Sequence, residues 1–151
     1  MLIRQWDECD IIKFFYFGGQ LYACRSKRGR ERTTMELEKY NICANEFKIV
    51  GAFQVRQCYF KNLFLSDFFR KYVYIVIGFA KEIKDKIIGP YLGMIKVNME
   101  SYSYEEDYAL TPCKNTHEDF LCHDQQHNLL YILNKEAFMT YSLDDETLLY
   151  K

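Results

Sequence analysis

The chain contains little proline or glycine, with two prolines and seven glycines in 151 residues. So few of either residue excludes a collagen-like or other fibrous repeat. Intrinsic disorder is excluded as well, because disordered chains are poor in aromatic side chains, which make up 17% of this sequence. Thirteen tyrosines also argue against a coiled coil. The composition therefore indicates a compact globular protein.

Long apolar segments are also missing. The strongest apolar run covers residues 72–80 and is flanked by Arg70, Lys71 and Lys81. Since a membrane-spanning helix needs about 20 apolar residues, this run predicts a buried core element and no membrane anchor. The length predicts a single globular domain over residues 1–151, which buries roughly two thirds of the surface that its unfolded chain exposes.

The first residues, MLIRQWDECD, lack the positively charged start and the apolar stretch of a secretory signal. We therefore expect a cytoplasmic protein whose six cysteines are reduced thiols, because the cytosol is a reducing compartment. Several cysteines have apolar neighbours, as in the segments 21–24 and 42–44, where a thiol serves as a small apolar side chain. No structural disulfide is expected.

The chain has no large excess of positive or negative charge: twenty basic and twenty-one acidic residues give a net charge of −1. A global field that would select a polyanionic partner is therefore absent. The halves of the chain differ, however. Residues 1–75 hold thirteen basic and eight acidic side chains, a net of +5, and residues 76–151 hold seven and thirteen, a net of −6. This division indicates either a chain that orients a charged partner or two halves that attract each other within the fold.

Strand patterns dominate the sequence. Residues 11–26 predict a hairpin, because two segments rich in β-branched and aromatic residues flank Gly18 and Gly19, which tolerate the positive φ of a tight turn. A second hairpin is predicted over residues 128–142, with its turn at 134–136. Further strands are indicated at residues 47–60, 91–99 and 143–150.

Two segments predict short helices. Thr33 stands three residues before Glu36, as in a helix capping box, and residues 62–71 predict a second helix. Over residues 72–87 a helical stripe competes with a dense run of β-branched and aromatic side chains, and we favour a strand at 72–79. The predicted fold is therefore α+β, a single β-rich domain with a mostly antiparallel sheet and one or two short helices.

All three histidines lie within eleven residues, in a segment that also holds two cysteines, residues 113–127. Zinc binds imidazole and thiolate in a tetrahedral arrangement, so the candidate metal ligands are Cys113, His117, Cys122 and His127. The same segment offers the side chains of a small Cys/His enzyme, in which a histidine activates Cys113 or Cys122 and a nearby aspartate orients that histidine. No CxxC pair is present, and a solvated polar loop explains the same residues.

Five basic residues occur within eight positions: Arg25, Lys27, Arg28, Arg30 and Arg32. Such a tract predicts a loop whose charges contact the phosphates of a nucleic acid, while aromatic neighbours stack on its bases. A localisation signal or a solvated loop has the same composition. Glu31, Glu36 and Glu38 reduce the local charge, and the chain lacks the strong basic excess of a dedicated nucleic-acid binder.

An acidic segment, residues 100–107, interleaves tyrosines with carboxylates. Tyrosine is enriched at protein interfaces, and acidic side chains orient a basic partner. The pattern therefore predicts a protein-binding surface made by Tyr102, Tyr104, Glu105, Glu106, Asp107 and Tyr108. Asp119, Asp124 and the segment 144–146 extend the negative charge. The alternative is a polar strand edge whose charges prevent aggregation.

The motifs of large enzyme families are absent from the sequence, including a glycine-rich phosphate loop, GxSxG, HExxH and the kinase set. The sequence favours binding over catalysis, and we expect a small intracellular protein-binding module, such as an inhibitor, an immunity protein or an antitoxin-like protein that occludes a partner. Two alternatives stay open. One is a small metal-dependent or Cys/His enzyme centred on residues 113–127, and the other is a nucleic-acid-binding domain that uses the basic loop 25–32. Zinc is the one cofactor that the sequence suggests.

Overall fold

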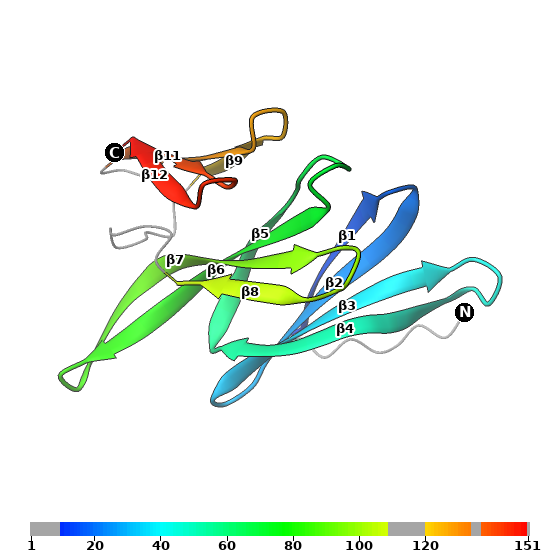
Figure 1. Cartoon of the computed structure of the whole chain (residues 1–151). Coiled ribbons are helices and arrows are strands. Elements are labelled where there is room, and N and C mark those ends of the chain that lie inside the picture. The colour runs from blue at the N-terminus through cyan, green and yellow to red at the C-terminus, as the bar shows by residue number, and fades with distance from the viewer. Residues whose placement is uncertain (1–9, 109–119, 134–136, 151) are drawn as a thin grey trace. The chain divides into compact units, whose positions relative to one another are not determined.

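A computed structural model describes residues 10–108, 120–133 and 137–150 of the chain (Figure 1). These residues form twelve strands in three four-stranded antiparallel sheets. The chain divides into two compact units, residues 1–59 and 60–151, and each is described separately. The single domain over residues 1–151 stays a prediction. No helix in the described ranges is long and apolar enough to cross a membrane.

The predicted α+β class is wrong, because the described residues form strands and no helix. The segment that begins at Thr33, predicted as a helix, lies in β3 (Arg32–Asn41). Thr33, Met35 and Leu37 are buried while the residues between them are half-buried, and this period of two selects a strand. The Thr33 hydroxyl does not cap a helix, because it donates to Cys58 O (3.2 Å) and accepts from Cys58 N (3.1 Å).

The second predicted helix, at residues 62–71, is also wrong. These residues contain the end of β5 (Cys58–Leu65) and a turn at 66–71. In the turn, Asp67 Oδ1 accepts a hydrogen bond from the main-chain nitrogen of Arg70 (2.8 Å). Short polar side chains that bond to the nearby main chain compete with helix formation, so the chain turns at this point.

The local strand predictions are confirmed. In the hairpin predicted at 11–26, β1 (Asp10–Phe17) pairs with β2 (Gln20–Arg28), and Gly18 and Gly19 have φ of 58° and 74°. The strand predicted at 72–79 lies in β6 (Tyr72–Ile83). In the second predicted hairpin, β10 pairs with β11, whereas its turn at 134–136 lies outside the described residues.

Unit 1 contains a meander in the order β1-β2-β3-β4, where β4 spans Glu46–Arg56. One face of this sheet carries apolar side chains that are at most 5% exposed: Tyr22, Cys24, Met35, Leu37, Phe53 and Val55. Burial raises the pKa of the Cys24 thiol to about 12, because apolar surroundings disfavour the thiolate. Cys24 is therefore a neutral component of this core at neutral pH.

The opposite face of the same sheet is concave. Phe14 on β1 and Phe47 on β4 have ring centroids only 5.9 Å apart, although two strands lie between β1 and β4 and a flat sheet would separate the outer strands by about 14 Å. The same face holds a buried ion pair between Arg25 Nη2 and Glu38 Oε1 (3.6 Å). Opposite charges that are buried together offset part of each side chain's desolvation cost.

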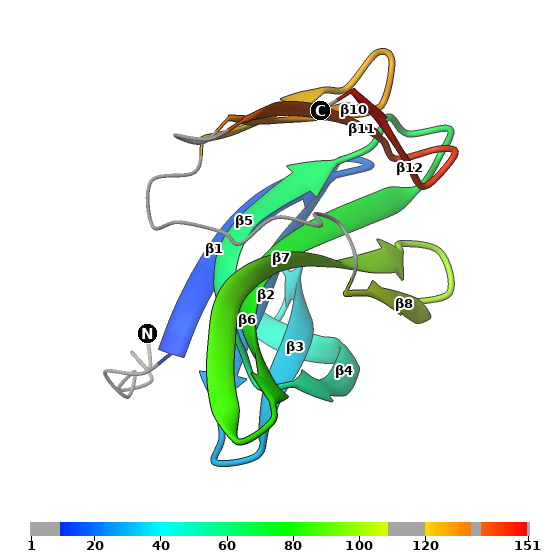
Figure 2. The same cartoon turned by 90° about the vertical axis from the view of Figure 1, so that its left-hand side faces the viewer.

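Unit 2 contains two sheets, with the strand orders β5-β6-β7-β8 and β12-β11-β10-β9. The strands not yet described are β7 (Lys86–Asn98), β8 (Tyr104–Asp107), β9 (Phe120–Asp124), β10 (Leu129–Leu133), β11 (Phe138–Ser142) and β12 (Thr147–Tyr150). The two sheets pack face to face as a sandwich (Figure 2). Side chains that are at most 3% exposed form their shared core: Tyr74, Val76, Leu92 and Met94 from the first sheet and Leu130, Ile132, Met139 and Tyr141 from the second.

Two leucines of β10 test this arrangement of inner and outer positions. Leu130 is fully buried in the sandwich core, whereas Leu133 is 47% exposed. We expect Leu130→Ala to lower the free energy of unfolding by about 2–5 kcal/mol, because it removes apolar contacts and leaves a cavity. The matched change Leu133→Ala should cost less than about 1 kcal/mol. Denaturant unfolding at pH 7 measures both, and equal losses would contradict the register of β10.

Candidate protein-binding surface

Four connections between strands meet at one end of unit 2: residues 66–71, 99–103, 125–128 and 143–146 (Figure 2). Main-chain hydrogen bonds join them in pairs. Met99 N donates to Lys71 O (2.8 Å), and Leu143 N donates to Asn128 O (3.0 Å). We call these four connections the loop end. Because each connection bonds to another, the loop end is braced and presents its side chains from a fixed main chain.

Arg70 ties two connections of the loop end together. Its guanidinium donates to Asp144 through Nε (2.9 Å to Oδ1) and Nη2 (2.9 Å to Oδ2), and it also pairs with Asp67. Two parallel bonds from a planar guanidinium to one carboxylate are stronger and more directional than a simple ion pair. The hydrogen bonds from Arg70 lower the pKa of Asp144 and outweigh the opposing effect of partial burial, so Asp144 is ionised at neutral pH.

Asn128 continues this polar chain into the sandwich. The residue is fully buried, and its Nδ2 donates to Asp144 Oδ1 (2.7 Å) and to the Tyr74 hydroxyl (2.8 Å). Its Oδ1 lies 3.0 Å from His123 Nε2, and since an amide oxygen only accepts, Nε2 of His123 carries a proton. Tyr74 belongs to β6 and His123 to β9. Asn128 therefore bonds to side chains from both sheets.

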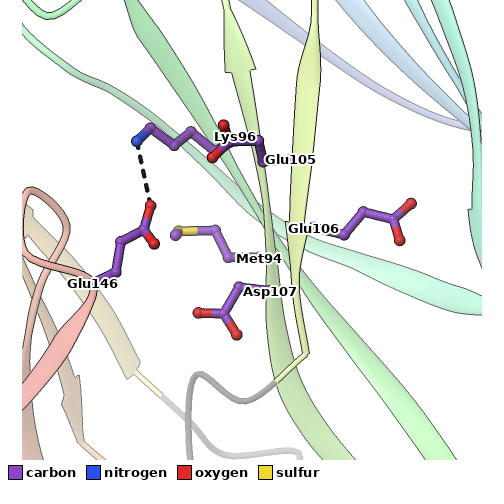
Figure 3. Close-up of a pocket in the computed structure, with 6 residues that line it drawn as sticks. All are labelled: Met94, Lys96, Glu105, Glu106, Asp107 and Glu146. Atoms are coloured by element: carbon purple, nitrogen blue, oxygen red, sulfur yellow. Dashed lines mark hydrogen bonds and ion pairs between the residues drawn. The ribbon is translucent and has the colours of Figure 1, made fainter.

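Close to the loop end lies an acidic pocket of about 40 Å³ (Figure 3). It is lined by Met94, Lys96, Glu105, Glu106, Asp107 and Glu146. Lys96 Nζ lies 3.4 Å from Glu146 Oε1 and 4.2 Å from the centroid of the Tyr72 ring. Four carboxylates against one ammonium give the lining a net negative charge. Glu106 points away from the other lining side chains (Figure 3), because side chains alternate along a strand.

The size of the pocket restricts what it can hold. Sites for organic ligands enclose about 300–1,000 Å³, whereas 40 Å³ has room for a few water molecules or the tip of one side chain. At one edge, the Tyr141 hydroxyl donates to Asp107 Oδ2 (3.0 Å). Burial, followed by the charge of Asp107, raises the pKa of Tyr141 above its ordinary value, so this hydroxyl stays a donor. The geometry can accept one basic side chain and has no room for a metabolite.

The predicted protein-binding segment divides over two faces of β8. Three of its residues are exposed, namely Tyr104, Glu105 and Glu106, and three are half-buried, namely Tyr102, Asp107 and Tyr108. Register places Glu105 and Asp107 on the Lys96 face of the sheet, and alternation puts Tyr104 and Glu106 on the other. The structure therefore brings Glu105 and Asp107 together with Glu146 and separates them from Tyr104. The role of these residues in binding stays a prediction.

The predicted metal ligands are only partly described, since Cys113 and His117 lie outside the described residues. Cys122 is exposed on β9, and His127 lies in the β9–β10 turn with Nδ1 2.7 Å from Asp124 Oδ2. This hydrogen bond from His127 lowers the pKa of Asp124. Across the part of the chain that the structure describes, no group of three or more His, Cys, Asp or Glu side chains could hold a metal ion. Zinc binding and the Cys/His enzyme both stay predictions.

The basic tract is partly neutralised by acidic side chains of β3. Arg25 is buried with Glu38, and Lys27 Nζ lies 3.6 Å from Glu36 Oε2. The Arg28 guanidinium stands over a tyrosine ring, 5.2 Å from the centroid of Tyr59. Arg30 and Arg32 are exposed, at the turn between β2 and β3 and at the start of β3. Nucleic-acid binding by this tract stays a prediction.

Sequence reasoning missed several residues of the loop end. The helix predicted at 62–71 obscured Arg70 and the neighbouring Phe68 and Phe69. The turn signal in that segment was the pair Ser66 and Asp67, residue types that bond to their own main chain and favour turns. For Asn128, no signal in the sequence indicates that the side chain is buried between two sheets.

No known protein family, curated protein or solved structure matches this chain. The candidate surface is therefore defined by its own geometry.

Replacement Asp144→Asn tests the ion pair of the loop end. Because Arg70 lowers the folded-state pKa of Asp144, the stability gained from the pair is complete above the pKa of an unfolded aspartate, about 3.9. It is lost as the pH falls through the lower folded-state pKa. We expect the variant to lose about 1 kcal/mol at pH 7, a modest value because solvent screens the half-exposed carboxylate.

The same variant should show a shallower decline of unfolding free energy below about pH 4, as measured by urea titration at several pH values. Asp145→Asn is the matched control, because Asp145 bonds to Ser142 and makes no contact with Arg70 in the described structure. If both variants followed the wild-type pH profile, the Arg70–Asp144 pair would have no stabilising role.

Proposed function

We propose that this protein is a small cytoplasmic protein-binding module, which acts as an inhibitor, immunity protein or antitoxin-like protein by occluding its partner. The observation that carries the proposal is the acidic pocket, which Glu105 and Asp107 of β8 line together with Glu146 of the β11–β12 connection. A surface of this kind suits a protein partner that offers arginine or lysine side chains.

The size and the charge of the pocket support a macromolecular ligand. Its 40 Å³ are too small for a metabolite but match the tip of one side chain, and a macromolecule makes further contacts on the surface around it. Carboxylates at the rim of an interface raise the rate of association with a basic partner and fix its orientation. Glu105 and Glu146 are exposed and are thus placed for this purpose.

The braced loop end supports an occluding role as well. Hydrogen bonds between the four connections order the main chain before a partner arrives, so that little conformational entropy is lost on binding. An inhibitor gains affinity in this way without catalytic residues of its own. The proposal requires no cofactor.

The proposal is tested by reversing the charge of the pocket. We expect affinity capture from the native cell to return one stoichiometric protein partner, and the double variant Glu105→Lys/Glu146→Lys to lose it. With the purified partner, calorimetry should show binding at least about tenfold weaker, because two attractive contacts become repulsive. Binding of the unmodified protein should also weaken as the ionic strength is raised.

The matched control is the double variant Glu31→Lys/Glu46→Lys, which changes the net charge by the same amount at exposed positions of unit 1. This variant should keep the partner. Thermal unfolding of both variants verifies that each is folded. Recovery of no protein, or of nucleic acid alone, would rule the proposal out, as would equal loss of the partner in both variants.

A further inference from the structure

The turn between β5 and β6 exposes two adjacent phenylalanines. Phe68 is 63% exposed and Phe69 is 91% exposed, the highest value among the large apolar side chains that the structure describes. A single exposed apolar residue is common on protein surfaces. Here one turn exposes two consecutive phenylalanines, and aromatic side chains are enriched at the centre of protein interfaces.

The main chain that carries these rings is held from several directions. Asp67 Oδ1 accepts from Arg70 N (2.8 Å), and Ser66 Oγ accepts from Tyr72 N (2.8 Å). From the β9–β10 connection, Gln125 Nε2 donates to Ser66 O (3.0 Å). The Arg70 ion pair described above adds a link to the β11–β12 connection. The turn is therefore ordered before binding, which lowers the entropic cost of docking.

The last residue of this turn has an uncommon main-chain conformation. Lys71 adopts a φ of 61°, in the left-handed region that residues other than glycine seldom occupy. Its main chain is held there by two bonds, from Lys71 N to Asp67 O (3.3 Å) and from Met99 N to Lys71 O (2.8 Å). Conformations of this kind persist where the surrounding structure enforces them.

The four connections of the loop end carry a net negative charge. Arg70 is paired with Asp67 and Asp144, and Lys71 Nζ lies 3.1 Å from Glu100 Oε2. The four connections together hold five acidic side chains against two basic ones, and one of the five, Glu146, pairs with Lys96 of β7. A partner that covers the loop end therefore meets more acidic than basic side chains.

We propose that Phe68 and Phe69 form the apolar anchor by which the loop end docks onto a polypeptide segment whose apolar side chains are flanked by arginine or lysine. The inference rests on the proposed function and specifies the apolar contact of the same partner-binding region. In the complex, apolar side chains of the segment cover the two rings, while its basic side chains lie over the carboxylates of the loop end.

Two other occupants of the anchor are disfavoured by charge. An anionic membrane surface attracts basic protein segments and repels a region with an excess of carboxylates. A second copy of this chain would bring the same patch against itself about a two-fold axis, so that like charges would face each other around the rings. A basic segment is the occupant that satisfies both the apolar and the charged part of the surface.

The experiment measures by fluorescence anisotropy how the chain of residues 1–151 binds a fluorescein-labelled peptide of alternating leucine and arginine. We expect saturable binding, which the double variant Phe68→Ser/Phe69→Ser weakens at least about tenfold because the apolar contact is lost. The matched control is Phe120→Ser, which removes a ring that is 72% exposed on β9. This control should bind the peptide like the unmodified protein.

Two altered peptides separate the apolar from the charged contribution. One replaces every leucine by serine, and the other replaces every arginine by glutamate. Each is expected to bind at least about tenfold more weakly than the leucine–arginine peptide. If the serine peptide bound as tightly as the leucine–arginine peptide, charge alone would account for binding. This result would overturn the proposed apolar anchor.

Three further results would overturn the proposal. The first is that the leucine–arginine peptide shows no saturable binding up to about 1 mM, or that the Phe120→Ser control loses as much affinity for the peptide as the phenylalanine double variant. The second is binding of phosphatidylcholine vesicles with about one fifth phosphatidylserine that depends on the two phenylalanines, which would identify a lipid surface. The third is a dimer in sedimentation velocity that the double variant abolishes, which would identify a second copy.

Failure of the anchor and failure of the proposed function give different results. If the peptide binds through Phe68 and Phe69 while capture from the native cell returns no protein, the anchor stands and the proposed function fails. If Glu105→Lys/Glu146→Lys loses a captured partner while the phenylalanine double variant keeps both the partner and the peptide, the proposed function stands and the anchor fails.

Discussion

The polar chain Arg70–Asp144–Asn128 is the interaction on which the arrangement of unit 2 depends. It begins at a guanidinium near the surface and ends at an amide that is fully buried between the two sheets. A buried amide without partners would cost about 1–3 kcal/mol. Asn128 avoids this cost because its nitrogen donates to Tyr74 and Asp144 and its oxygen faces His123. The same bonds that satisfy the amide also join the two sheets.

The proposed binding features lie on or beside this polar chain. Asp144 and Glu146 belong to the same connection, so the ion pair that holds Asp144 also positions Glu146 over the pocket. Arg70 lies in the turn that exposes Phe69, and its bonds to Asp67 and Asp144 keep that turn ordered. A single network of charge-assisted hydrogen bonds therefore supports both the acidic pocket and the apolar anchor.

Local pattern and long-range contact contributed differently to the predictions. The hairpin at 11–26 was predictable, because its turn depends on two adjacent glycines and its strands on the residues that directly flank them. The strand at Thr33 was not, because the Thr33 hydroxyl bonds to a residue far along the chain, Cys58, whereas the turn at 66–71 had a local signal in Ser66 and Asp67. Of the candidate surface, the acidic character of 100–107 was visible in the sequence. The approach of Glu146 to Lys96 was not, because it depends on how two sheets pack.

The sequence by itself determined that the chain is globular and β-rich, that residues 72–79 form a buried strand, and that carboxylates concentrate in the C-terminal half. These properties follow from composition and from the period of side chains along a strand, which act locally. Only the tertiary structure decided that the Thr33 hydroxyl bonds to Cys58, that the His123 ring packs against Phe64 and Tyr74, and that Glu146 approaches Lys96. Each of these depends on contacts between residues that are distant in the sequence, and no local pattern encodes those partners.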